Sequence, residues 1–234
     1  MKKFLILNSA FLILNLVSNA QVFILGGKGI LNYSTFMNDN ANINGTKLDK
    51  EFTMGGQGGI YFRYYFNEAT YYNNTNVSLA IELLFGSYGQ KYKANLVDTS
   101  AHSKISVSSM DIPVMVHVRG QAGLYAEAGV SFGMINGVTY DFSRDPDSNP
   151  SSNFSGAVDS SFASSNLSGI FGFGIDSELN DKLNLTIGFR LTYGLTDLTE
   201  PQKSNSTDYK ETHSATVGFV VGVAYILNFF HDYH

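Results

Sequence analysis

The segment KLNLTIGFRLTYGLTD, residues Lys182 to Asp197, alternates strictly between apolar and polar residues. One parity is apolar and comprises Leu183, Leu185, Ile187, Phe189, Leu191, Tyr193 and Leu195. The other parity holds Asn184, Thr186, Gly188, Arg190, Thr192, Gly194 and Thr196. Successive side chains of a β-strand point to opposite faces, so the alternation predicts a strand with one apolar and one polar face.

The predicted strand is long enough to cross a membrane. Strands of soluble domains usually have about 5–6 residues, whereas a tilted membrane-crossing strand needs about 9–11. The same alternation recurs elsewhere in the chain and gives eight predicted strands. They cover approximately residues 22–34, 52–66, 77–89, 104–119, 124–134, 167–179, 183–195 and 216–229.

The connections between these strands differ in length. Gly120-Gln121 and Asn180-Asp181-Lys182 are tight turns, whereas residues 35–50, 141–166 and 197–211 form long polar connections. Two connections fit less well, because residues 67–75 are long for a turn and residues 93–103 are short for a loop. Short turns at one end and long loops at the other are typical of outer-membrane barrels.

Lipid cannot hydrogen-bond an open sheet edge, so a membrane-spanning sheet must close. We therefore expect an all-β fold, an eight-stranded antiparallel up-and-down transmembrane β-barrel with long extracellular loops. An even number of strands places both termini at the same end, which for an exported chain is the periplasmic end. The interior of an eight-stranded barrel is only wide enough for side chains to fill it.

The first 20 residues have the features of a secretory signal peptide. Lys2 and Lys3 precede an apolar stretch that ends in small residues at Ser18 and Ala20, which predicts cleavage before Gln21. Residues 1–20 would then be removed, and residues 21–234 would form the barrel domain. An uncleaved anchor helix is the alternative. The chain contains no cysteine, which excludes lipoprotein acylation and disulfides.

Composition limits the partners that we expect. The net charge is −5 and basic clusters are lacking, which argues against binding to nucleic acid. We expect a monomer without a cofactor, in contact with outer-membrane lipids and with other cell-envelope or secretion proteins. The localisation that follows is the outer membrane of a Gram-negative bacterium.

Strand parity places charged residues on the polar, interior face. The expected interior charge network comprises Lys28, Arg63, Glu82, Asp111, Glu127 and Arg190, and the same parity adds His117, Arg119, Asp176 and Glu178. Burying a charge is costly unless it is paired. We therefore expect Arg63 and Arg190 to pair with Glu82, Glu127 or Asp111, beside Gly and Ser residues that make room for long side chains.

Aromatic residues cluster near one predicted periplasmic connection. They are Tyr61, Phe62, Tyr64, Tyr65, Phe66, Tyr71 and Tyr72. Tyrosine suits a bilayer boundary, because its ring lies in the apolar zone and its hydroxyl at the headgroups. Pro113 lacks a ladder donor, so within a strand it predicts a β-bulge or bend.

One hairpin resembles a known family. MDIPVMVHVRG is followed after a tight turn by GLYAEAGVSFGM, and this pair is similar to the central hairpin of the PorT-like outer-membrane β-barrel proteins. The shared features are Ile112-Pro113, the turn at Gly120–Gly123 and Glu127-Ala128-Gly129. The resemblance implies an outer-membrane location and a link to protein secretion. It also implies a terminal aromatic assembly signal, for which Phe230 and Tyr233 are the two candidates.

The sequence contains no catalytic or metal site that we expect to function. His213 and Ser214 point to opposite faces of a strand, so a lipid hydrolase would need another serine, from Ser160, Ser161, Ser164 or Ser165. The run from Asp145 begins with the spacing of a calcium loop, but Pro150 and Gly156 stand where glycine and glutamate are required.

The function that we expect is structural or interactive, through extracellular loops, with a polar lumen filled by side chains. A narrow small-solute channel, lined by the interior charges, is one alternative. A lipid-modifying enzyme is another. A soluble periplasmic lipocalin-like barrel is the third, and it would have its apolar side chains inside and its polar ones outside.

Overall fold

The computed structural model describes residues 22–37, 42–43, 46–47, 49–66, 75–96, 99–144, 154–158, 162–199 and 211–228. Eight long strands form the body of the fold: β1 (Val22–Met37), β5 (Thr53–Tyr65), β6 (Asn76–Leu96), β7 (Thr99–Arg119), β8 (Leu124–Arg144), β10 (Ser165–Asn180), β11 (Leu183–Gly194) and β12 (His213–Asn228). Four short strands accompany them: β2 (Asn42–Ile43), β3 (Thr46–Lys47), β4 (Asp49–Glu51) and β9 (Phe154–Ala157).

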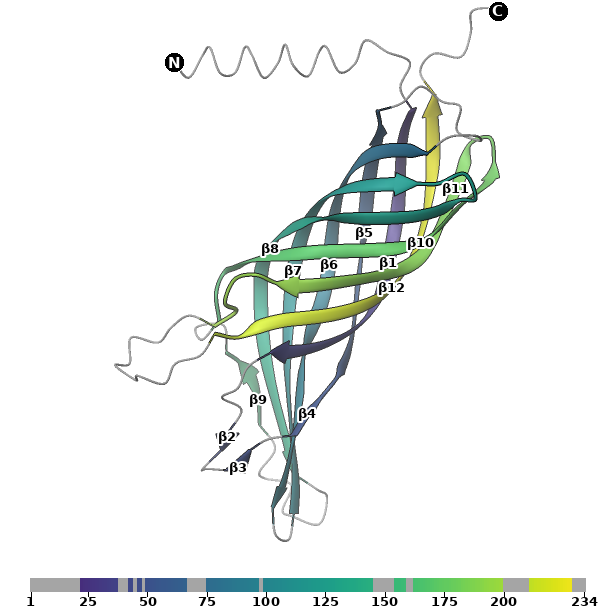
Figure 1. Cartoon of the computed structure of the whole chain (residues 1–234). Coiled ribbons are helices and arrows are strands. Elements are labelled where there is room, and N and C mark those ends of the chain that lie inside the picture. The colour runs from purple at the N-terminus through teal and green to yellow at the C-terminus, as the bar shows by residue number, and fades with distance from the viewer. Residues whose placement is uncertain are drawn as a thin grey trace, which may run out of the picture.

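The eight long strands form a closed antiparallel ring (Figure 1). β1 pairs with β12 on one side and with β5 on the other. The first half of β8 closes the ring by pairing with β10, from Leu124↔Ile175 to Met134↔Ser165. The predicted fold class is confirmed. Among the described residues, none belongs to a helix long and apolar enough to cross a membrane.

Three neighbouring strands continue beyond the ring at the end opposite the tight turns. β6, β7 and β8 have 21 residues each. The connection predicted at residues 93–103 is largely strand, because the β6–β7 ladder runs on from Lys93↔His102 to Leu96↔Thr99. β4 pairs with the extended part of β6, and β9 with that of β8. Together these strands form a projecting end (Figure 1).

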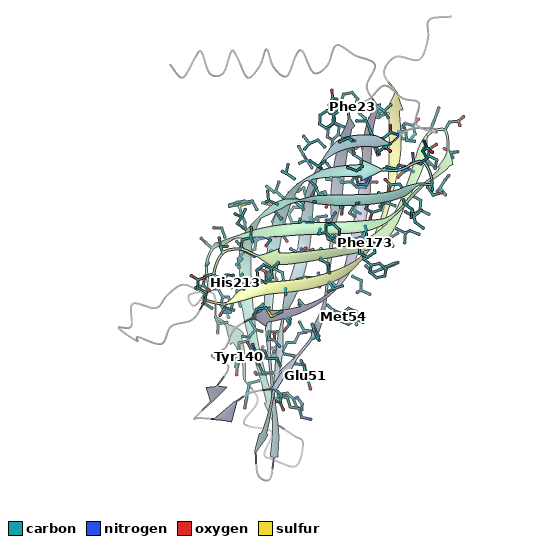
Figure 2. The ribbon with its side chains drawn as sticks, in the orientation of Figure 1. Phe23, Glu51, Met54, Tyr140, Phe173 and His213 are labelled. Carbon is teal, nitrogen blue, oxygen red and sulfur yellow. The ribbon has the colours of Figure 1, made fainter. Side chains whose placement is uncertain are left out.

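Apolar side chains of the long strands face outwards and polar ones face inwards, as the sequence predicts. The exposed large hydrophobic residues include Ile187, Phe189 and Leu191 on β11 and Val217, Phe219 and Val221 on β12. Figure 2 labels two other outward aromatic residues, Phe23 near the end where β1 begins and Phe173 midway along the barrel. The alternating polar residues Asn184, Thr186 and Arg190 are buried inside. A soluble lipocalin-like barrel would have the opposite facing.

The interior is less uniformly polar than predicted. An apolar layer of Val22, Ile24, Tyr61, Tyr65, Ala224 and Ile226 fills the end where β1 begins and β12 ends. A second apolar layer of Phe36, Tyr88, Val107, Val138 and Leu198 lies towards the opposite end. Smaller apolar clusters lie between these two layers, so the lumen holds apolar as well as polar side chains along its length.

The aromatic cluster divides between the two faces. Phe62 and Phe66 are exposed, whereas Tyr61 and Tyr65 are buried in the lumen. On the outer surface, the Tyr64 ring lies 5.3 Å from Phe23 and 5.3 Å from Phe66. The cluster predicted as one interfacial belt is therefore also part of the apolar layer inside the barrel. Tyr71 and Tyr72 lie outside the described residues.

Pro113 does not mark a β-bulge, which was one of the two features predicted for it. It pairs in register with Ser131 on β8. On its other side, the ladder to β6 passes from Ile81↔Val114 to Leu84↔Asp111 without a change of register, as expected for a residue without a donor N–H. The pair of β7 and β8 does contain a bulge, but it lies at Ser108 and Ser109. The predicted signal peptide, the Asp145 run and the candidate assembly signals Phe230 and Tyr233 lie outside the described residues.

Candidate functional site

The middle of the lumen holds a connected set of charged side chains. We call it the interior charge network, and it comprises Lys28, Arg63, Glu82, His117, Glu127, Asp176 and Arg190, all of them buried. Its members come from seven of the eight long strands. Each lies on the polar parity of its strand, which is why a pattern with period two could place them all inside.

Arg190 on β11 joins two carboxylates. Its Nη1 donates to Glu82 Oε2 at 2.7 Å and its Nη2 to Glu82 Oε1 at 3.0 Å. Its Nε and Nη2 also donate to Glu127 Oε1, at 3.0 Å and 2.6 Å. The Lys28 ammonium donates to Glu82 as well. Planar guanidinium groups suit such two-point contacts, so Arg190 has two of its three expected partners.

Asp176 on β10 is the second centre of the network. Its Oδ2 accepts a hydrogen bond from Arg63 Nη1 at 2.6 Å, and its Oδ1 accepts one from Thr186 Oγ1 at 2.5 Å. The prediction for Arg63 was therefore wrong, because Arg63 pairs with Asp176 rather than with Glu82, Glu127 or Asp111. Sequence parity placed Asp176 inside but could not show which cation lies across the barrel.

His117 connects the two centres. Its Nε2 lies 2.9 Å from Asp176 Oδ2, and its Nδ1 lies 3.5 Å from Glu127 Oε2. Its ring stacks on Tyr125, with centroids 4.7 Å apart. The shorter contact is a hydrogen bond, whereas Nδ1 has no hydrogen-bond partner among the described residues. His117 thus completes a chain of contacts from Lys28 to Arg63.

Glycines make room for this network, as predicted. A Cβ atom at Gly172 would lie 2.6 Å from Glu127 Oε1 and 2.7 Å from Glu127 Cγ. A Cβ atom at Gly222 would lie 3.4 Å from the Tyr61 ring, which the Lys28 ammonium covers at 4.7 Å from the centroid. Small residues on β10 and β12 therefore allow long charged side chains from other strands to fill the lumen.

A second, smaller pair lies nearer the tight turns. Arg119 Nη2 is 3.4 Å from Glu178 Oε1 and 3.4 Å from the Asp176 carbonyl oxygen. Of the ten interior residues predicted from parity, the structure thus connects nine, either in the network or in this pair. Asp111 stands apart from both.

Asp111 lies on the other side of the network, towards the projecting end, and its described partners are uncharged. Its Oδ2 accepts hydrogen bonds from Gln57 Nε2 at 2.6 Å and Ser109 Oγ at 2.7 Å. It borders a cavity of about 40 Å³ that is partly continuous with solvent. Arg190 also lines this cavity, together with Asn32 and Ser131.

The described start of the connection between β11 and β12 places an apolar side chain inside the barrel. Leu198 is fully buried in the second apolar layer, next to Phe36 and Val107. Asp197 fixes the segment, because its Oδ1 accepts hydrogen bonds from the backbone N–H groups of Thr199 and Thr212 at 3.0 and 2.9 Å. The sequence assigned residues 197–211 to an extracellular loop and missed this inward side chain; a lone leucine in a polar run was the only signal.

His213 has no serine among its described contacts. Its Nε2 lies 3.2 Å from Glu211 Oε2, and its ring stacks on Tyr193 with centroids 5.8 Å apart. Ser214 is buried on the opposite face and lines the lumenal cavity. Ser164 and Ser165 are exposed, while Ser160 and Ser161 lie outside the described residues. Within the described part of the chain, no group of three or more His, Cys, Asp or Glu residues is arranged to hold a metal ion.

A family model described as an outer membrane protein beta-barrel domain matches residues 19–200. A search of curated proteins gave no match. Several solved structures are similar at low identity. Ail, the attachment invasion locus protein of Yersinia pestis, solved with the heparin analogue sucrose octasulfate, is 13% identical over 89% of this chain and 100% of its own, with a TM-score of 0.38.

Two further structures show the same level of similarity. Neisserial surface protein A is 10% identical, over 88% of this chain and 97% of its own, with a TM-score of 0.38. OprG from Pseudomonas aeruginosa is 16% identical, over 89% of this chain and 97% of its own, with a TM-score of 0.35.

Proposed function

The chain belongs to the family of outer-membrane protein β-barrel domains, and from this premise we propose that it is a non-conducting barrel that contacts other envelope or surface molecules through its projecting end. Outer-membrane lipids surround its apolar outer face. The barrel acts as a monomer, without a cofactor and without a catalytic centre. Both termini lie in the periplasm.

The filled lumen is the observation that carries this proposal. The apolar layer around Ile24 and Tyr61, the interior charge network and the apolar layer around Leu198 follow one another along the barrel. Eight strands leave an interior that side chains can fill completely. A solute crossing the barrel would have to displace three layers of packed or paired side chains, which argues against the alternative of a small-solute channel.

The projecting end supports a role in contact. Its described surface carries charged and hydrogen-bonded side chains: Lys91 Nζ pairs with Glu51 Oε2 at 3.2 Å, and Asp141 accepts a hydrogen bond from Ser155. Figure 2 labels Glu51 and Tyr140 on this end. Paired strands that carry lysine and carboxylate side chains fit an aqueous space better than lipid. They offer a defined, hydrogen-bonded surface to a partner outside the cell.

We also propose that this chain is related to the PorT-like proteins within that family. Ile112-Pro113 on β7 and Glu127-Ala128-Gly129 on β8 form part of one hairpin, whose tight turn contains Gly123 with a φ of 77°. Glu127 is a member of the interior charge network. The resemblance supports a partner from the cell envelope or from protein secretion.

The proposal predicts no channel activity. Purified, folded protein in planar bilayers is expected to give no steady single-channel steps above the background of protein-free detergent, because each layer of the lumen is closed. Current recordings over a range of voltages measure this directly. Reproducible unitary steps that depend on the folded protein would sink the non-conducting assignment and favour the channel alternative.

Orientation can be tested because the chain lacks cysteine. Lys104 lies exposed on the projecting end, and Asp181 lies exposed in the tight turn between β10 and β11. In intact cells, Lys104→Cys is expected to react with a membrane-impermeant maleimide, whereas Asp181→Cys is expected to react only after permeabilisation of the outer membrane. The reverse labelling pattern would place the termini outside the cell.

A further inference from the structure

Asp111 differs from the other lumenal carboxylates in the part of the chain that the structure describes. Glu82, Glu127, Asp176 and Glu178 each have an arginine or lysine within ion-pair distance. Asp111 has only Gln57 and Ser109. Asp111 is half-buried, and a carboxylate that has lost part of its water is stabilised by a compensating charge. The protein supplies that charge to four of these five groups.

Two buried oxygen atoms beside the same cavity also lack partners. Asn32 is 1% exposed and Ser131 is 5% exposed, and both line the cavity that Asp111 borders. The described residues provide no hydrogen-bond partner for Asn32 Oδ1 or Ser131 Oγ. Buried polar atoms of this kind are rare unless a water or a ligand satisfies them. They come from β1 and β8 and line the same cavity as Asp111 on β7.

The type of ligand follows from charge and donor type. The groups in question are a carboxylate, an amide oxygen and a hydroxyl, which are hard oxygen ligands of the kind that alkali and alkaline-earth cations prefer. Asp111 contributes one negative charge, so one positive charge neutralises the site. A divalent ion would leave an excess charge near Arg190, which lines the same cavity. The cavity volume of about 40 Å³ leaves room for one ion with a few water molecules.

We propose that the lumenal cavity at Asp111 is a binding site for a single monovalent cation of sodium or potassium size, with Asn32 and Ser131 as neutral oxygen ligands. The bound cation neutralises Asp111 and ties β1, β7 and β8 together between the interior charge network and the apolar layer around Leu198. This site does not depend on what the projecting end contacts.

The test compares cations at equal ionic strength. Folded protein in detergent is heated in potassium chloride, sodium chloride or N-methylglucamine chloride, whose cation is too large for direct coordination by these groups. The unfolding temperature of the wild type is expected to rise with potassium or sodium concentration relative to N-methylglucamine, since a ligand that binds only the folded state stabilises it.

Two variants and one diffraction measurement locate the site. Asp111→Asn keeps the shape of the side chain and is expected to raise the half-maximal cation concentration at least about tenfold, a factor that corresponds to about 1.4 kcal/mol. The matched control Asp141→Asn removes an exposed carboxylate from the projecting end and is expected to leave that concentration unchanged. Crystals of the wild type in rubidium chloride should show an anomalous peak beside Asp111, even if Asp111→Asn fails to fold.

Each contrary outcome overturns the proposal. Equal unfolding temperatures in the three salts, or no rubidium peak in the cavity, would mean that the cavity holds only water. An unchanged cation response in folded Asp111→Asn would place the ion elsewhere. A half-maximal response to calcium far below that to potassium would refute the assignment to a singly charged ion.

Discussion

Replacement of Arg190 by methionine is expected to lower the free energy of unfolding by about 3–5 kcal/mol. Methionine fills a similar space but removes the guanidinium that contacts both Glu82 and Glu127. Lys28 remains beside Glu82 and His117 beside Glu127, yet two buried carboxylates would share less positive charge. Denaturant unfolding in detergent, followed by the gel mobility of unheated samples, measures the loss.

A charge-matched variant separates the pairing from the packing. Adding Glu127→Gln to Arg190→Met removes one of the carboxylates that lose their partner, so the double variant is expected to be more stable than Arg190→Met alone. Arg190→Lys keeps the charge but cannot make the same two-point contacts, and we expect it to fall between the wild type and Arg190→Met. A loss below about 1 kcal/mol for Arg190→Met, the size found for exposed ion pairs, would mean that the network is hydrated.

Replacement of Phe189 by arginine is expected to cost about 2–4 kcal/mol, the penalty for a cation on the lipid face at mid-membrane. Phe189 lies in the middle of β11, faces outwards, and has the rings of Phe219 and Phe173 at 5.5 and 6.1 Å. Folding into lipid vesicles, followed by denaturant titration, measures the change.

Leu179→Arg is the matched control for Phe189→Arg. Leu179 is equally apolar and exposed, but it lies beside the tight turn between β10 and β11. Near the bilayer boundary the cost of arginine falls to about 0–1 kcal/mol. Equal effects of the two substitutions in vesicles would contradict a bilayer centred on the middle of β11. They would be expected instead if the outer face were in water.

Much of the candidate site could be predicted from residue parity. Lys28, Glu82 and Arg190 each occupy a polar position in an alternating strand, so their inward direction follows from the local backbone. Their partners do not follow from it. Arg63 and Asp176 lie on strands that are not neighbours in the sheet, and they meet only because the closed ring brings opposite walls within the reach of a guanidinium.

The sequence determined the class of the fold, its eight strands and the facing of each strand, because period-two alternation acts within a few residues of local chain. It did not determine the length of the β6–β7 hairpin, since the pairing of Leu96 with Thr99 depends on ladder bonds that continue through polar residues. The tertiary structure alone decided that Leu198 enters the barrel and that Asp111 has no cationic partner among the described residues. Both outcomes depend on which side chains the closed ring places opposite each other across the lumen. The distance between opposite walls is set by the whole ring and not by any one strand.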